Sequence, residues 1–312
     1  MSAVPRSDMA KPRALLTGRT GFTGRYVAHE LEQAGYEVIG LASQMGDSEA
    51  GLTIQANLLD RDAVAKAVAE ADADVVVHLA AVAFVAHGDV DEMYRVNVVG
   101  TRNLLEALAG AQKRPELVVL ASSANVYGNA EVDPITEDTP PAPANDYAVS
   151  KLAMEYMAKL WMDRLPITVT RPFNYTGVGQ SEHFLIPKIV AHFAQERGVI
   201  ELGNTGVIRD FSDVRDIAAA YLRIIQSRPI GRVINLCSGK GYSLSDVINA
   251  MTRISGHKLR IEVNPGFVRH GEVLRLVGSS SLLDVGWEGQ SARSLEETLD
   301  WMYQSAREGI HD

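Results

Sequence analysis

Thr17-Gly18-Arg19-Thr20-Gly21-Phe22-Thr23-Gly24 follows an apolar run at 14–16 and precedes a helical pattern over 26–31. The apolar run predicts a buried strand, so the glycines fall in a strand-to-helix turn. Glycines at this spacing let the backbone turn sharply, approach a pyrophosphate and pack the helix against the sheet, while the helix start presents N–H groups to phosphate. A plain glycine-rich turn is the simpler alternative. We interpret the segment as a dinucleotide-binding loop whose binding residues are Gly18, Thr20, Gly21, Phe22, Thr23 and Gly24.

Strand and helix patterns alternate along the first half of the chain. Strands are expected at 13–17, 37–42, 52–56, 74–78, 117–121 and 166–171, and helices near 24–34, 61–71, 91–111 and 146–163. This alternation predicts an α/β fold in which helices cover both faces of a parallel sheet. Beyond Arg171 the alternation becomes irregular.

The composition limits the partners and the compartment. The 312 residues carry a net charge of −9, which argues against a nucleic-acid or anionic-membrane surface. The sequence has no uninterrupted apolar run of membrane-spanning length. The single cysteine, Cys237, excludes an internal disulfide and is expected to be a core thiol. We therefore expect a cytoplasmic protein that binds no nucleic acid, no membrane and no metal.

Tyr147 and Lys151 are four residues apart in the predicted helix 146–163. Side chains at this spacing lie on one face of a helix, about 5–6 Å apart at Cβ. A nearby ammonium favours the phenolate, so we expect Lys151 to lower the pKa of Tyr147 from about 10 toward neutrality. Tyr147 is then a candidate proton donor and acceptor. The alternative is an ordinary half-exposed helix face.

Two serines, Ser122 and Ser123, directly follow the predicted strand 117–121. Open α/β sheets bind their ligands at the carboxyl ends of the parallel strands. A serine hydroxyl at this place is therefore a candidate ligand contact.

The glycine loop, the strand-end serine and the Tyr-x-x-x-Lys pair occur in this order along the chain. Together they resemble the extended short-chain dehydrogenase/reductase family, in its NAD-dependent epimerase/dehydratase branch. Further matching segments are His78-Leu-Ala-Ala81, Asn97, Arg171-Pro-Phe-Asn174 and Arg209-Asp-Phe-Ser-Asp-Val-Arg-Asp216.

The resemblance implies a Rossmann-type doubly wound parallel sheet with a smaller C-terminal α/β substrate domain. The implied dinucleotide-binding domain is 12–172 plus 206–237, and the implied sugar-nucleotide domain is 173–205 plus 238–305.

A nicotinamide dinucleotide is the cofactor that the resemblance implies. Its further binding residues are then Asn57, Leu58, Leu79, Ala80, Ala81, Tyr147 and Lys151. His78 is expected to be a hydrogen-bonded residue at a strand end.

The residue at the end of the second predicted strand bears on whether NAD(H) or NADP(H) is preferred. NAD binding usually uses an acidic residue at the end of this strand, and this chain has Ala42 there. Without a carboxylate a 2′-phosphate is not repelled, and Arg19 or Arg25 could attract it, unless both are merely solvated charges. We expect NADP(H) to be preferred, with NAD(H) possible.

The family couples hydride transfer at a sugar carbon to proton transfer at its oxygen. By resemblance Tyr147 gives the proton, Lys151 supports it, and Ser123 donates a hydrogen bond to the developing oxyanion. Ser123 is chosen over Ser122 because the family places this hydroxyl four residues before the tyrosine of Val-Tyr-Gly, here Tyr127.

Ala124 and Asn125 argue against a dehydratase. Dehydratases of the family place an acidic pair or a glutamate at these positions, and an amide cannot act as a general base. Asn125 is otherwise a turn residue.

Segments 171–180, 184–188, 235–239 and 269–272 resemble the GDP-4-dehydro-6-deoxy-D-mannose reductases of the family. Tyr175 and Val178 replace a usual histidine and proline. The implied substrate is a nucleotide sugar, expected to be GDP-linked, and its implied contacts are Asn174, Arg209, Arg269 and Glu272.

Each arginine among these contacts has a structural alternative. Arg209 and Arg269 suit a pyrophosphate because each offers a fork of N–H donors. Arg209 could instead form an ion pair with Asp210 or Asp213, and Arg269 could be a solvated loop charge.

Three functions stay open. The first is NAD(P)H-dependent reduction of a GDP-4-keto-6-deoxyhexose to GDP-D-rhamnose or its 4-epimer. The second is an NDP-sugar 4-epimerase that retains NAD, and the third is a non-catalytic cofactor-sensing protein.

The family also implies a homodimer through the helices near 91–111 and 146–163. Apolar residues such as Met154, Met157, Leu160 and Trp161 serve either that face or the core.

Overall fold

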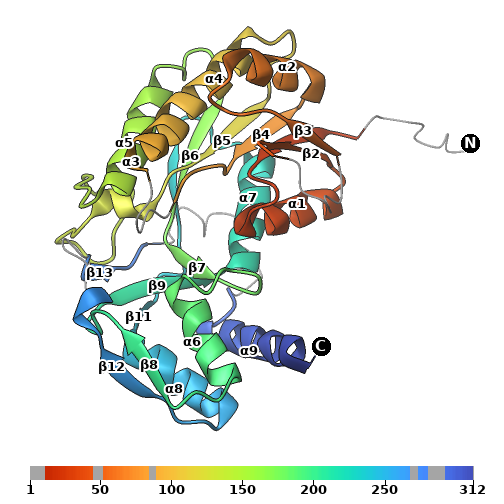
Figure 1. Ribbon diagram of the computed structural model, residues 1–312. Helices are drawn as coiled ribbons and strands as arrows, with labels where there is room; N and C mark the ends of the chain where they lie inside the picture. The colour runs from red at the N-terminus through yellow and green to blue at the C-terminus, as the bar shows by residue number, and fades with distance from the viewer. Residues whose placement is uncertain (1–10, 45–51, 84–88, 268–272, 280–291, 312) are drawn as a thin grey trace, which may run out of the picture.

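A computed structural model describes residues 11–44, 52–83, 89–267, 273–279 and 292–311. A seven-stranded parallel sheet forms the larger lobe (Figure 1), with the strand order β10-β6-β5-β4-β1-β2-β3. Its strands are β1 Arg13–Thr17, β2 Glu37–Ala42, β3 Leu52–Gln55, β4 Val75–His78, β5 Leu117–Ala121, β6 Ile167–Pro172 and β10 Val233–Leu236.

Helices cover both faces of this sheet. One face packs against α1 Phe22–Gln33 and α7 Val214–Ser227, and the other against α2 Arg61–Ala71, α4 Thr101–Gly110 and α5 Asp146–Lys159 (Figure 1). The central strands are buried on both faces because apolar residues of each contribute to both cores. The predicted doubly wound α/β fold is confirmed.

The strand order reverses between β1 and β4. From β1 the chain proceeds outward to β2 and β3, and from β4 it proceeds to β5 and β6 on the other side. Thr17 and His78, the last residues of the two strands, are paired in the register. Ligands of open α/β sheets bind outside the carboxyl ends of the strands at such a reversal. The fold therefore brings the loops that follow β1, β4 and β5 together.

The helix expected over 91–111 contains a π-helical segment. It consists of α3 Val90–Tyr94, the π-helix η1 Arg95–Gly100, and α4. Asn97, in η1, exchanges two hydrogen bonds with the backbone of Val82 (2.9 and 3.1 Å) and donates to Ser150 Oγ on α5 (3.0 Å). The widened turn thus fastens the segment after β4 to the helix that carries Tyr147.

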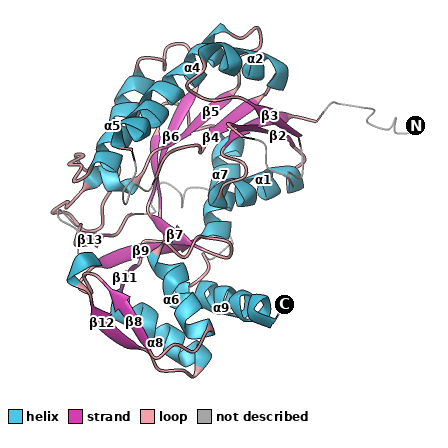
Figure 2. Cartoon of the chain, viewed as in Figure 1, coloured by secondary structure: helices cyan, strands magenta, loops and turns pink. Residues whose placement is uncertain are grey.

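The smaller lobe contains two further sheets (Figure 2). The first consists of β7 Asn174–Thr176, β9 Ile208–Asp213, β11 Gly241–Ser243 and β13 Arg275–Leu276, and the second of β8 Val199–Leu202 and β12 Arg260–Val263. Helices α6 Leu185–Ala194, α8 Leu244–Ser255 and α9 Leu295–His311 belong to this lobe.

The interval 206–237 contributes to both lobes. Within it, β9 pairs with β7, β11 and β13, whereas α7 and β10 pack in the larger lobe. The domain boundaries given above remain a proposal.

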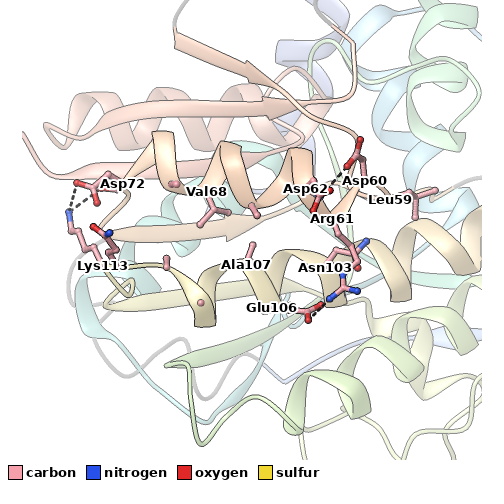
Figure 3. Close-up of a pocket in the computed structure, with 15 residues that line it drawn as sticks. Leu59, Asp60, Arg61, Asp62, Val68, Asp72, Asn103, Glu106, Ala107 and Lys113 are labelled. Atoms are coloured by element: carbon pink, nitrogen blue, oxygen red, sulfur yellow. Dashed lines mark hydrogen bonds and ion pairs between the residues drawn. The ribbon is translucent and has the colours of Figure 1, made fainter.

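A groove of about 1200 Å³ lies between α2 and α4 (Figure 3). The Arg61–Glu106 ion pair (2.5 Å) spans it near one end, and Lys113 pairs with Asp74 (2.8 Å) near the other. None of the proposed catalytic residues lines it. No helix in the described part of the chain is long and apolar enough to cross a membrane.

Candidate active site

The glycine loop has room for no side chain at two of its positions. Gly18 has φ of +73°, and a Cβ there would lie 3.0 Å from the Ala80 nitrogen. A Cβ on Gly24 would lie 2.0 Å from the Gly18 carbonyl oxygen. Gly21 is the N-cap of α1 and no side chain caps that helix, so its first N–H groups face outward at the positive end of the helix dipole. This cradle fits the pyrophosphate of a dinucleotide.

His78 connects the ends of β1 and β4 as a neutral ring. The Thr101 hydroxyl donates to the Asn97 carbonyl (2.8 Å), so it accepts a proton from Nε2 of His78 (2.9 Å). Nδ1 then accepts from the Thr17 hydroxyl (2.7 Å), whose oxygen accepts the Ala80 N–H (3.1 Å). Burial, and secondarily the charge of a nearby lysine, lowers the pKa of His78 to about 3. His78 is the hydrogen-bonded strand-end residue that the sequence predicted.

The residues proposed for the adenosine end lie at the carboxyl ends of β2 and β3. Asn57 is exposed and accepts the Leu59 N–H (2.9 Å), while Leu58 is buried. Arg19 pairs with Glu32 on α1 (2.8 Å), and its side chain is only 11% exposed. Its stem lies over β2, because a Cβ on Gly40 would be 3.0 Å from the Arg19 Cδ.

The two loop arginines therefore point to different places. Arg19 lies against the strand that ends at Ala42, where an adenosine ribose is expected. Arg25 donates to the Gly179 carbonyl (3.3 Å), in the segment after β7. Arg19 is the better placed of the two for a 2′-phosphate.

Ser123, Tyr147 and Lys151 meet at the carboxyl end of β5. Ser123 is buried and is the N-cap of the 3-10 turn η2 Ala124–Tyr127. The Lys151 ammonium is buried, donates to the Ala121 carbonyl (2.8 Å) and lies 6.0 Å from the centre of the Tyr147 ring. The structure thus brings the three residues proposed for catalysis together.

The pKa of Tyr147 differs from the expectation. Burial, and then the neighbouring Tyr175, raises the pKa of Tyr147 above its ordinary value, and a hydrogen bond with Ser123 opposes this only in part. The predicted lowering by Lys151 is wrong for this structure, because the ammonium points to the Ala121 carbonyl and desolvation outweighs its charge. Burial lowers the pKa of Lys151 to about 8, with Glu155 opposing.

A buried ionic network lies beneath these three residues. Glu155 accepts from the Ser122 hydroxyl (2.5 Å) and from Nε and Nη2 of Arg171 (2.9 and 2.6 Å). Arg171 Nη1 donates to Tyr127 Oη (2.9 Å), which donates to Asn235 (2.7 Å). The Ser122 hydroxyl is therefore used within the protein, whereas Ser123 lies outside this network.

Sequence reasoning missed Glu155. The feature that could have indicated it is a carboxylate four residues after Lys151, between Met154 and Ala158, which are buried on an apolar helix face.

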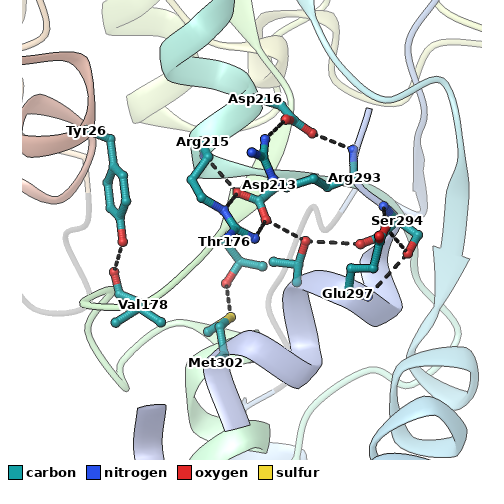
Figure 4. Close-up of polar contacts among 11 residues, drawn as sticks. Tyr26, Thr176, Val178, Asp213, Arg215, Asp216, Arg293, Ser294, Glu297 and Met302 are labelled. Carbon is teal, nitrogen blue, oxygen red and sulfur yellow. Dashed lines mark hydrogen bonds and ion pairs between the residues drawn. The ribbon is translucent and has the colours of Figure 1, made fainter. Parts of the chain in front are cut away.

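The start of α1 is joined to the first strand of the smaller lobe. Thr23 and Tyr175 share a hydrogen bond between their hydroxyls (2.7 Å), and the Phe22 and Tyr175 rings stack with centroids 6.1 Å apart. Tyr26 donates to the Val178 carbonyl (2.8 Å; Figure 4). This α1–β7 joint places the glycine loop directly against the segment proposed to contact substrate.

A second junction lies at the start of α7 (Figure 4). Asp213 caps this helix, pairs with Arg215 (2.6 Å) and accepts from Thr298 on α9 (2.8 Å). Asp216 pairs with Arg293. These contacts fix the geometry of the two lobes with respect to each other.

Two of the four proposed substrate contacts are within the described residues. Asn174 is exposed at the start of β7, and Arg209 is half-buried on β9, where it donates to the Ile208 carbonyl (3.0 Å). Strands β7 and β9 are paired, so the two residues lie in one sheet. Arg269 and Glu272 lie outside the described residues.

Both aspartates that were named as alternative partners of Arg209 have other partners. Asp210 accepts from the Ser238 hydroxyl (2.6 Å) and from the Gly239 N–H (2.9 Å). Asp213 pairs with Arg215.

Comparison with known proteins shows the family of this chain. The model of the NAD dependent epimerase/dehydratase family matches residues 14–237, more than half of the chain. The chain belongs to this family. It is therefore an NAD(P)-dependent enzyme of the short-chain dehydrogenase/reductase type that acts on nucleotide sugars.

Two curated relatives of this family member act on GDP-linked 6-deoxyhexoses. The chain is 33% identical to GDP-6-deoxy-D-talose 4-dehydrogenase of Aggregatibacter actinomycetemcomitans over 94% of this chain and 97% of the relative. It is 36% identical to GDP-6-deoxy-D-mannose reductase of Pseudomonas aeruginosa over 73% of this chain and 80% of the relative.

Solved structures share the fold over nearly the whole length. A protein from Burkholderia cenocepacia is 50% identical over 96% of this chain and all of that one, with a TM-score of 0.90. RMD from Pseudomonas aeruginosa, complexed with NADPH, is 30% identical over 96% of this chain and 99% of that one, with a TM-score of 0.83.

Proposed function

We propose that this family member reduces the C4 keto group of a GDP-4-keto-6-deoxyhexose, converting GDP-4-dehydro-6-deoxy-D-mannose to GDP-D-rhamnose or its 4-epimer. The observation that carries this proposal is that Ser123, Tyr147 and Lys151 meet at the carboxyl end of β5, where the Tyr147 phenol is protonated at neutral pH. A proton donor is what reduction of a ketone requires. The two curated relatives, whose names contain a GDP-linked 6-deoxyhexose, support the choice of substrate.

Each residue then has one role in the reaction. Tyr147 donates its proton to the keto oxygen, and Ser123 donates a hydrogen bond to the same oxygen as negative charge develops there. Lys151 in its ammonium form stabilises the phenolate that proton donation leaves, until solvent returns the proton. Bound nicotinamide dinucleotide supplies the hydride that the C4 carbon receives.

Arg19 supports NADPH as the preferred cofactor. Its side-chain stem lies over the strand that ends at Ala42, and this strand end carries no carboxylate to repel a 2′-phosphate. The solved relative that holds NADPH agrees with this preference. The adenosine, pyrophosphate and nicotinamide ribose would be held by residues of the glycine loop, 57–58, 79–81, Tyr147 and Lys151.

Asn174, Arg209, Arg269 and Glu272 are proposed to bind the sugar nucleotide. The guanidinium groups of the two arginines would contact its pyrophosphate, since a forked donor matches phosphate oxygens. The exposure of Asn174 at the start of β7 supports a contact with the sugar.

A homodimer is proposed through α5 and η1. Val149 and Tyr156 of α5 and its C-cap Leu160 are 39, 57 and 79% exposed, and Val99 of η1 is 43% exposed. The spacing of the α5 residues places them on one helix face. Met154 belongs to the core, and Met157 and Trp161 pack against it, so the exposed residues are those left for a partner.

The alternative is a 4-epimerase that retains NAD, because Ser123, Tyr147 and Lys151 would serve its transient oxidation equally well. The deciding experiment mixes the purified protein with GDP-4-keto-6-deoxy-D-mannose and follows NADPH and NADH absorbance, with Tyr147→Phe as the control. Stoichiometric oxidation that the variant abolishes supports the reductase, and NMR of the product identifies the sugar. Absence of oxidation, together with tightly retained cofactor, would replace the reductase with the epimerase.

A further inference from the structure

The Ser123 hydroxyl is held from one side by a single residue. Its Oγ accepts the backbone N–H of Asn125 (3.2 Å) and also the side-chain Nδ2–H of Asn125 (3.1 Å). A serine hydroxyl has two acceptor sites and one proton to donate. Both acceptor sites are therefore filled, and donation of the proton is the capacity that is left.

The Ser123 proton that remains is available to the reacting groups. Ser122, the adjacent serine, donates to Glu155 and takes no part in this arrangement. A hydrogen bond between the Ser123 and Tyr147 side chains is one of the influences that lower the pKa of Tyr147, so the two side chains lie next to each other. A keto oxygen that receives the proton of Tyr147 could then also accept a hydrogen bond from Ser123.

We propose that Asn125 is a positioning residue, which fills the acceptor sites of Ser123 so that the serine O–H is aimed at the substrate carbonyl oxygen. This inference rests on the proposed reductase function. A backbone N–H to a serine two residues earlier occurs in many turns, so the side-chain amide is the part that the turn alone does not need. Asn125 is half-buried, which keeps water from replacing that amide freely.

The chemistry of residue 125 follows from this role. An amide donates to Ser123 and carries no charge, whereas a carboxylate would accept the serine proton and turn it away from the substrate. An alanine would leave one acceptor site of the serine open to water, so its proton would have no fixed direction.

The test compares Asn125→Ala and Asn125→Asp with the wild-type enzyme, each with and without Ser123→Ala. We expect Asn125→Ala to lower kcat about five- to tenfold with little change in KM or in NADPH affinity. In the Ser123→Ala background the same substitution should change kcat less than about twofold, because its target is gone. Thermal unfolding of each variant measures any structural effect separately.

Asn125→Asp distinguishes a positioning role from a purely structural one, because only the positioning role predicts a pH dependence of the activity ratio. Its kcat relative to wild type should rise as the pH falls from about 8 to about 5, because a protonated carboxyl donates again. Equal losses from Asn125→Ala in both backgrounds, or a pH-independent ratio for Asn125→Asp, would overturn the inference while leaving the reductase intact. A wild-type enzyme that reduces no 4-keto sugar would overturn both, and that measurement is made first.

Discussion

Replacing Glu32 by glutamine should tighten NADPH binding and leave NADH binding nearly unchanged. Glu32 pairs with the guanidinium of Arg19, the group that we propose for the 2′-phosphate. The carboxylate therefore competes with the phosphate for the same N–H donors. Removing its charge frees the guanidinium, and only a cofactor with a 2′-phosphate gains from this.

The magnitude follows from the exposure of the pair. Glu32 is 45% exposed and Arg19 only 11%, so solvent screens the interaction from the carboxylate side. Pairs of this kind contribute about 0.2–1 kcal/mol. The gain in NADPH affinity should therefore be between about 1.4- and fivefold, and it should shrink in high salt.

The assay is a fluorescence titration of both cofactors against wild type, Glu32→Gln and Glu30→Gln. Glu30 lies on the same helix and loses the same charge, so it controls for the general effect of net charge. The reasoning is refuted if Glu32→Gln tightens NADH as much as NADPH, or if Glu30→Gln has the same effect on the NADPH dissociation constant. Arg19→Gln should weaken NADPH and not NADH.

Three further outcomes are expected. The kcat/KM for reduction should fall above about pH 8, because the pKa of Lys151 is lowered to about 8 and its ammonium form is the active one. A pH profile that stays flat to about pH 9.5 would contradict this. Gly24→Ala should destabilise the protein by about 1–3 kcal/mol in urea unfolding, because the new Cβ would lie 2.0 Å from a loop carbonyl oxygen. A loss of unfolding free energy below about 0.5 kcal/mol would show that the loop shifts to accommodate the methyl group. Glu155→Ala should cost about 3–5 kcal/mol because it leaves Arg171 buried without its counter-charge, whereas Glu296→Ala, which breaks an exposed pair, should cost less than about 1 kcal/mol.

The sequence predicted the parallel sheet well, for a physical reason. Each strand of such a sheet is buried on both faces, so it is a short continuous apolar run that needs no knowledge of its partners. The six strands expected before residue 173 are found to within one residue. The strands of the smaller lobe are short and pair across long intervals, as β7 does with β9, and no local pattern specifies such pairings.

The site was predictable as a set of residues and not as a set of interactions. Motif spacing indicated Ser123, Tyr147 and Lys151, but the direction of the tyrosine pKa depends on burial and on the contact of Lys151 with the Ala121 carbonyl. The π-helical turn at 95–100 likewise depends on Asn97 reaching the backbone after β4. Both features are set by tertiary contacts, which propensity and periodicity do not contain.

The α1–β7 joint has a consequence for the order of events in turnover. Phe22 and Thr23 belong to the proposed cofactor loop and contact Tyr175 of the smaller lobe, so a ligand that orders one side of this joint would also order the other. Linkage makes this reciprocal: if the dinucleotide tightens sugar-nucleotide binding by some factor, the sugar nucleotide tightens the dinucleotide by the same factor. With coupling of this kind each product would bind more tightly while its companion stays bound, and departure of the first would weaken the binding of the second.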